Sequence, residues 1–273
     1  MANAEHPASD AVRAFARLGY FARGTVYLTL AVVTALAAFG ATQPESSEGA
    51  LRTVYSMPLG TVLLVALFAG LVAFGGWRVC QSVFDADNHG RDLRAVVVRI
   101  GLGSSALLHF GLALAALTLL LDWNPGGGGG GGQSAQEDWT AWLLDQPYGL
   151  WLTYGLAACI FGAGIAISYK GYDAGFRKWM KLEHKPVRLL SPVCQVGLVT
   201  RGLISLGVGV FLAQAAWRSN AGEVAGLKEM LEMLQAQVYG AWLLAAASVG
   251  LLSFAVYSFV ESVYREIQGL DEW

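Results

Sequence analysis

The chain has 273 residues, of which 55% are apolar and 14% are charged, with a formal net charge of -2. Soluble domains carry roughly 25% charged residues, so this composition, with a mean hydropathy of +0.48, excludes an ordinary water-soluble domain. Acidic residues are spread along the chain and the net charge is near zero, so no nucleic-acid partner is expected.

Six apolar stretches are each long enough to cross a bilayer as a helix, which takes about 20 residues. They cover residues 18–39, 59–82, 97–121, 148–169, 193–217 and 239–260. We therefore predict an all-α integral membrane protein with six transmembrane helices in contact with the lipid bilayer. The first stretch does not end in a small-residue cleavage pattern, so we expect it to stay in the protein as an anchor.

The six stretches form three consecutive pairs that repeat one another. The first helix of each pair begins with the same pattern, a glycine followed four residues later by a pair of residues, without insertions or deletions. The pattern is Gly19 with Arg23-Gly24, Gly101 with Ser105-Ala106, and Gly197 with Arg201-Gly202. The second helices begin at Gly60, Gly149 and Gly240. The prediction is a single membrane domain, residues 1–273, made of three tandem helical hairpins with pseudo-threefold symmetry. The repeats cover residues 13–87, 94–176 and 191–267.

The connecting segments carry their own patterns. Before each second helix an amphipathic stretch, at 50–55, 139–144 and 227–234, predicts a short interfacial helix on the outer face. Residues 124–136 contain seven consecutive glycines and predict a flexible loop. The basic segment 176–181 mixes cations with large apolar residues. It suits a helix lying on an anionic inner leaflet, and an ordinary positively charged loop fits equally well.

Lysine and arginine are distributed unevenly about the predicted spans. All except Arg52, Arg218 and Lys228 lie in segments on the same side as the N-terminus. Because cytoplasmic loops of membrane proteins are enriched in these residues, we expect both termini to be cytoplasmic.

The repeated first-helix phrases, the outer amphipathic stretches and the Pro-x-Gly or Tyr-Gly start of each second helix resemble a bacterial family of integral membrane proteins. That family is a domain of unknown function built from three tandem two-helix repeats. The resemblance covers residues 16–267, with Arg23-Gly24 and Arg201-Gly202 closest to the family pattern and Ser105-Ala106 departing from it. It implies the predicted fold and a multi-pass protein of the bacterial inner (plasma) membrane, and it implies no activity.

Two groups of polar residues inside the spans are candidate functional sites. Tyr27, His109 and Ser205 occupy equivalent repeat positions about 15 Å into the first helices, near the bilayer midplane. If these helices line the pseudo-threefold axis, the three side chains form a polar cluster there. An intramembrane histidine suggests a proton relay or a ligand-binding role. The alternative is that His109 hydrogen-bonds a neighbouring group as a packed core residue.

The second group lies nearer the cytoplasm. Arg23 and Arg201 lie about 7 to 9 Å inside their spans, and Glu261, at the inner end of the sixth span, is their expected counter-ion. Arginine forks match phosphate and carboxylate oxygens, which suggests a cytoplasmic site for an anion or lipid headgroup. The alternative is that these arginines extend back to lipid phosphates.

No catalytic motif and no set of metal ligands is visible, so we expect neither an enzyme nor a metal site, and the sequence specifies no cofactor. The function we expect is that of an accessory or scaffolding subunit that binds other membrane proteins or lipids. The alternative is a small transporter or channel with its pathway on the pseudo-threefold axis.

Overall fold

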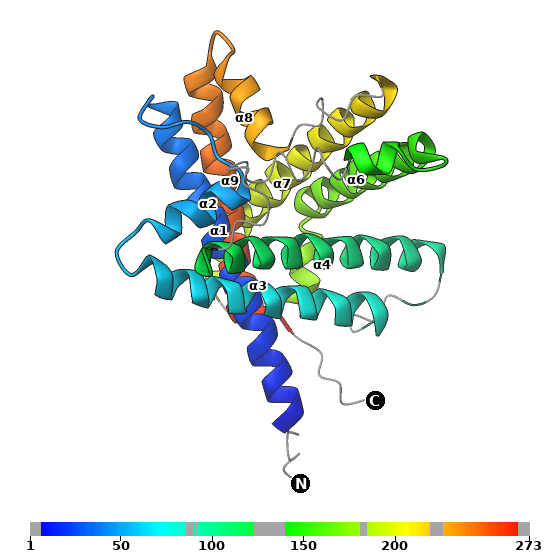
Figure 1. Ribbon diagram of the computed structural model, residues 1–273. Helices are drawn as coiled ribbons and strands as arrows, with labels where there is room; N and C mark the ends of the chain where they lie inside the picture. The colour runs from blue at the N-terminus through cyan, green and yellow to red at the C-terminus, as the bar shows by residue number, and fades with distance from the viewer. Residues whose placement is uncertain are drawn as a thin grey trace.

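The computed structural model describes residues 7–85, 90, 92–122, 140–180, 185–218 and 226–266. Within these ranges the chain is helical and contains no named strand, which confirms the predicted all-α fold (Figure 1). The long helices are α1 (Pro7–Ala38), α3 (Gly60–Val83), α4 (Leu93–Leu120), α6 (Gly149–Tyr172), α7 (Lys185–Arg218) and α9 (Gly240–Tyr264).

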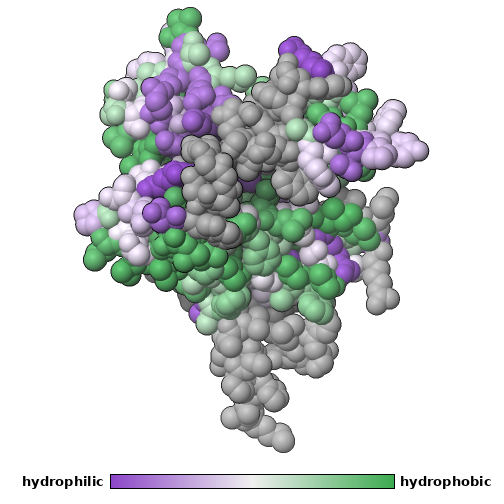
Figure 2. Space-filling view, in the orientation of Figure 1, coloured by the Kyte–Doolittle hydropathy of each residue, from purple (hydrophilic) through white to green (hydrophobic). Residues whose placement is uncertain are grey.

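Each of these six helices is long and apolar enough to cross a membrane. Their exposed surfaces are rich in large apolar side chains, such as Val62 on α3 and Leu107 on α4, of which 65% and 74% are exposed. Figure 2 shows such side chains spread over the surface around α3 and α4. Apolar surface of this extent is stable against lipid and unfavourable in water. Because successive spanning helices alternate in direction, α1, α4 and α7 begin on the side where α3, α6 and α9 end, which we call the terminal side.

The tightest helix pairs join neighbouring repeats. α3 packs most extensively against α4, α6 against α7, and α9 against α1. Each pair combines the second helix of one repeat with the first helix of the next, and the α9 to α1 pair closes the series. This order is what a pseudo-threefold arrangement requires. Within the repeats, α1 also packs on α3 and α7 on α9, whereas α4 and α6 have almost no contact.

A glycine and a phenylalanine explain why the two helices of the first and third repeats pack closely. A Cβ atom at Gly19 of α1 would lie 2.6 Å from the Cα of Phe74 on α3. At the equivalent Gly197 of α7, a Cβ would lie 2.4 Å from the backbone nitrogen of Phe254 on α9. Counted from the start of their helices, Phe74 and Phe254 occupy the same position. Only glycine permits helix backbones to approach this closely.

The middle repeat lacks this contact. At Gly101, the equivalent of Gly19, a Cβ would meet none of the described residues within 4 Å. The position of Phe74 on the second helix is taken in α6 by Ala163, and the residue before it is an exposed glycine, Gly162. The middle repeat thus lacks the contact between a glycine and a phenylalanine, and α4 and α6 lie apart. We call the repeat-equivalent positions left uncovered on these two helices, Gly101 of α4 and Gly162 and Ala163 of α6, the seam.

Short helices precede the second helices, as predicted for the outer face. α2 (Ser47–Tyr55) is capped by Ser46, whose hydroxyl accepts a hydrogen bond from the Gly49 backbone, and it buries Leu51 against the long helices. α8 (Leu227–Gln235) buries Leu231, and residues 140–144 are helical. The predicted glycine-rich loop, 124–136, lies outside the described residues.

The basic segment after α6, for which a helix on the inner leaflet and an ordinary charged loop were both predicted as possible, packs part of its length against the protein. It forms a short 3-10 helix, η1 (Gly175–Trp179), and the side chains of Phe176 and Met180 are buried in a core shared with α7 and α9. The Met180 backbone also pairs with that of Arg265, just beyond α9. An amphipathic pattern cannot tell whether its apolar side meets lipid or protein, and here it meets protein.

Candidate functional site

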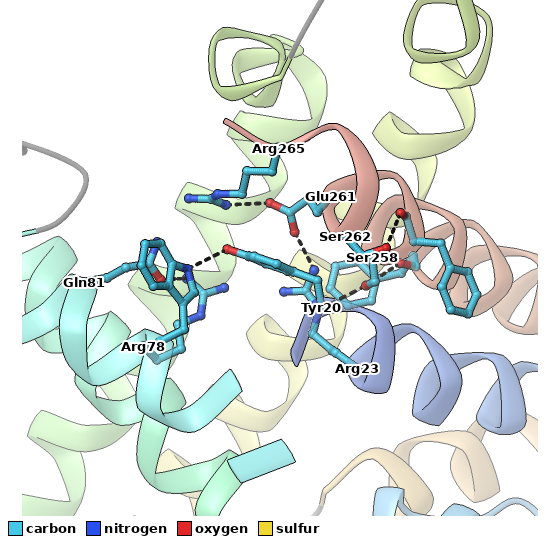
Figure 3. Close-up of polar contacts among 11 residues, drawn as sticks. Tyr20, Arg23, Arg78, Gln81, Ser258, Glu261, Ser262 and Arg265 are labelled. Atoms are coloured by element: carbon cyan, nitrogen blue, oxygen red, sulfur yellow. Dashed lines mark hydrogen bonds and ion pairs between the residues drawn. The ribbon is translucent and has the colours of Figure 1, made fainter. Parts of the chain in front are cut away.

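The strongest polar contact between described residues far apart in the sequence joins α1 to α9. The Nη2 atom of Arg23 lies 2.5 Å from Oε2 of Glu261, and the two side chains are only 7% and 3% exposed. The Arg23 Nε also donates to the Ser258 hydroxyl at 3.0 Å. The counter-ion expected for Arg23 is therefore present (Figure 3).

Local sequence brings these helices together. Gly24, next to Arg23, lies so close to α9 that a Cβ added there would be 2.6 Å from the ring of Phe259. The Ser258 hydroxyl, which receives the Arg23 hydrogen bond, itself donates to the Phe254 carbonyl of its own helix at 2.9 Å. The Arg-Gly pair of the sequence thus supplies both a cation and the room for the neighbouring helix.

A second arginine shares the carboxylate. Arg265 follows the last residue of α9, and its Nη1 donates to Oε1 of Glu261 at 2.7 Å. It is 5% exposed. Both oxygens of Glu261 are therefore occupied by guanidinium groups. In the sequence, Arg265 contributed only to the charge asymmetry, and its position directly after the apolar stretch is the signal that could have singled it out.

The third arginine of this region, Arg78, comes from α3. Its Nη1 donates to Oε1 of Gln81 at 3.0 Å, and its guanidinium carbon lies 4.7 Å from the centre of the Phe74 ring. The Nε of Arg78 is buried and has no hydrogen-bond partner. Gln81 occupies the repeat position that Glu261 has in α9, so the first repeat supplies an amide where the third supplies a carboxylate.

Aromatic rings connect the three guanidinium groups. The guanidinium carbon of Arg23 lies 4.9 Å from the Phe74 ring centre and 5.2 Å from that of Tyr20. Arg265 lies 5.3 Å from the same Tyr20 ring. Such contacts between a cation and a ring stabilise desolvated arginine by about 2 kcal/mol. We call Arg23, Arg78, Arg265 and Glu261 the arginine cluster.

Arg201 is not part of this cluster, contrary to the prediction that it shares a site with Arg23 and Glu261. Its Nη1 donates to the hydroxyl of Ser205, one turn along the same helix, at 2.7 Å. No hydrogen bond or ion pair joins it to Arg23 or Glu261 within the described part of the chain.

The three predicted midplane residues also have separate partners. The Tyr27 ring packs edge-on against Phe254 at 4.6 Å, and the His109 ring packs against Phe74 at 4.4 Å. The Nδ1 of His109 is 2.7 Å from the Ser105 carbonyl oxygen, which can only accept, so Nδ1 carries the proton. The third residue, Ser205, accepts the hydrogen bond from Arg201 described above. Across the described residues, no hydrogen bond or ring contact joins the three to one another.

The seam is a candidate site of a different kind, because it has no polar chemistry. Every glycine within α1, α3, α7 and α9 has a neighbour that an added Cβ would meet within 4 Å. On α4 and α6, by contrast, a Cβ added at any of four glycines would meet no residue in the described part of the chain within 4 Å, namely Gly101, Gly111, Gly155 and Gly162. Among the described residues there is also no group of three His, Cys, Asp or Glu side chains that could hold a metal ion.

Six long apolar helices, arranged in repeats, define a multi-pass helical membrane protein. Residues 18–85, 100–173 and 196–265 each match the Domain of Unknown Function (DUF1206), and the chain belongs to this family. Each match holds most of one first helix and the whole of one second helix, so the resemblance inferred from the sequence is confirmed.

One relative extends the similarity over almost the whole chain. The protein is 29% identical over 259 residues to Uncharacterized protein YxxB of Bacillus subtilis (strain 168), a comparison that covers 94% of this chain and 92% of that one. No solved structure matches the chain significantly.

Proposed function

We propose that this protein is a non-enzymatic accessory subunit of the bacterial inner (plasma) membrane, and that a transmembrane helix of another membrane protein docks in the seam. The observation that carries the proposal is that the described residues of α4 and α6 have almost no contact, where the equivalent helices of the other repeats pack closely. The basic residues near the terminal side support an orientation with both chain ends in the cytoplasm.

A helix suits the seam better than a lipid tail. Glycine in a helix interior costs about 1 kcal/mol relative to alanine, and in membranes this cost is offset when another backbone packs against it. A lipid tail gains nothing from glycine that it would not gain from leucine. In the first and third repeats the equivalent surface is covered by Phe74 and Phe254 of the chain itself. The middle repeat leaves the same surface for a partner.

The test is to fill the seam without disturbing the fold. Gly101→Leu combined with Gly162→Leu places side chains where an added Cβ meets no described residue within 4 Å. Val65→Leu, on the exposed surface of α3, is the matched control. We expect one membrane protein to co-purify at fixed stoichiometry with the wild type and the control and to be lost from the double variant. Retention of the same protein by the double variant would contradict the proposal, provided that its helical content and elution volume are unchanged.

The alternative, a small transporter or channel on the pseudo-threefold axis, has less support because Tyr27, His109 and Ser205 have separate partners. It makes a distinct prediction. His109→Ala would abolish flux through proteoliposomes in a transporter and leave partner binding unchanged. Loss of ion or solute flux in that variant alone would favour this alternative over the docking subunit.

A further inference from the structure

The charge of the arginine cluster points to a ligand. Arg23, Arg78 and Arg265 meet near one carboxylate, Glu261, and both of its oxygens are used by Arg23 and Arg265. Arg78 makes no ion pair with any described residue. A cation inside an apolar helix is costly and is normally paired. Here the ring of Phe74 and the amide oxygen of Gln81 provide only partial compensation.

The geometry points to a phosphate group, and we propose that Arg78 is the anchor of a binding site for a phosphate-bearing anion beside the Arg23 to Glu261 pair. This proposal does not depend on a partner in the seam. Arg78 has a buried Nε with no partner and donates through Nη1 to Gln81, which leaves hydrogen-bonding capacity on the guanidinium fork. Such a fork binds phosphate oxygens with two parallel hydrogen bonds.

The depth of Arg78 in the membrane allows a phosphate group to reach it from two sources. It lies five residues before the end of α3, about 7.5 Å along the helix axis from the terminal side, and its side chain is half-buried. The phosphate of an anionic lipid headgroup can reach this depth, and so can free phosphate that enters from the terminal side. Both would neutralise the same guanidinium.

The test is ligand binding to the purified full-length protein in detergent after removal of lipid. Phosphatidylglycerol is titrated and followed by native mass spectrometry, and inorganic phosphate is titrated against chloride at equal ionic strength and followed by thermal unfolding. Arg78→Gln is compared with the wild type. The control is Arg188→Gln, which removes an exposed arginine from the terminal side of α7.

We expect Arg78→Gln to bind the phosphate ligand about tenfold more weakly than the wild type, because it loses charge-assisted hydrogen bonds. Arg188→Gln should bind like the wild type. If the wild type binds phosphatidylglycerol more tightly than Arg78→Gln does and inorganic phosphate has no effect, the ligand is a lipid headgroup. If inorganic phosphate stabilises the wild type, the ligand is a soluble anion. Equal binding of both ligands by the wild type and Arg78→Gln overturns the proposal.

A second comparison covers the case in which Arg78→Gln does not fold. The wild type is titrated with diacylglycerol, which has the same tails without the phosphate, and Arg78→Lys keeps the charge without the fork. The site predicts that the wild type prefers phosphatidylglycerol to diacylglycerol, and that Arg78→Lys folds and binds with intermediate affinity. No preference for phosphatidylglycerol or phosphate over diacylglycerol and chloride overturns it.

Discussion

Arg23 and Glu261 lie 238 positions apart in the sequence, and their side chains form a buried ion pair that joins the first long helix to the last. The pair holds α1 against α9, which is the contact that closes the series of three repeats. The same carboxylate accepts a hydrogen bond from Arg265. The closure of the fold and the neutralisation of two buried arginines therefore depend on one side chain.

Replacing this carboxylate should destabilise the protein strongly. Glu261→Gln leaves Arg23 and Arg265 without their shared counter-ion, and removing one member of a buried pair costs about 3–5 kcal/mol. The measurement is the melting temperature in detergent. Glu232→Gln, in the solvent-accessible Lys228 to Glu232 pair at 3.9 Å, is the control and should cost at most about 1 kcal/mol. Equal effects of the two changes would show that the buried pair does not hold the fold.

Two equivalent glycines should respond in opposite ways to the same substitution. Gly197→Ala would place its Cβ 2.4 Å from the backbone of Phe254, so α7 and α9 must move apart and the melting temperature should fall. The Cβ added by Gly101→Ala meets no neighbour among the described residues, so this change should raise stability by up to about 1 kcal/mol through helix propensity. A similar loss in both variants would mean that α4 and α6 pack together after all.

His109 should contribute to the stability of the fold through the packing of its ring. His109→Phe keeps the contact with Phe74 and loses only the hydrogen bond to the Ser105 carbonyl, so we expect almost unchanged stability. His109→Ala loses the ring contact and should cost about 1–3 kcal/mol. Thermal unfolding of the two variants distinguishes them. A larger loss in His109→Phe than in His109→Ala would show that the imidazole nitrogens carry the role.

The orientation can be tested directly. The basic residues predict that reporters fused to the N-terminus and to the C-terminus both report a cytoplasmic location. The measurement uses paired fusions, one active only in the cytoplasm and one active only outside it. A terminus whose fusion is active only outside the cytoplasm would contradict the proposed orientation, in which both chain ends are cytoplasmic.

The spans and the repeat pattern could be predicted because apolar length and exact repeat spacing are local properties of the sequence. The helix pairs could not, since every span is apolar on most faces and none specifies which neighbour it contacts. The fifth apolar span was predicted at 193–217, and the helix that contains it, α7, begins earlier, at Lys185, and continues through Pro192. Proline removes one helical hydrogen bond and favours a kink, and neighbouring contacts can compensate.

The candidate site was predicted in part. Arg23 and Glu261 could be paired because both are charges near the same end of apolar stretches. Arg78 was missed as a site residue, because it was counted with the positively charged residues of the following loop. The departure of the middle repeat was visible at Ser105-Ala106. Its consequence also depends on Ala163, which counting from Gly149 aligns with the phenylalanines of the other repeats, and only the structure showed that those phenylalanines contact Gly19 and Gly197.

The central claim is that a helix of another membrane protein occupies the seam, and site-specific photo-crosslinking in native membranes tests it most directly. A photoreactive residue is placed at Gly101, at Gly162 and, as the lipid-facing control, at Val65 of α3. We predict adducts with one and the same protein from both seam positions and adducts with lipid alone from position 65. Lipid adducts alone from all three positions would contradict the claim.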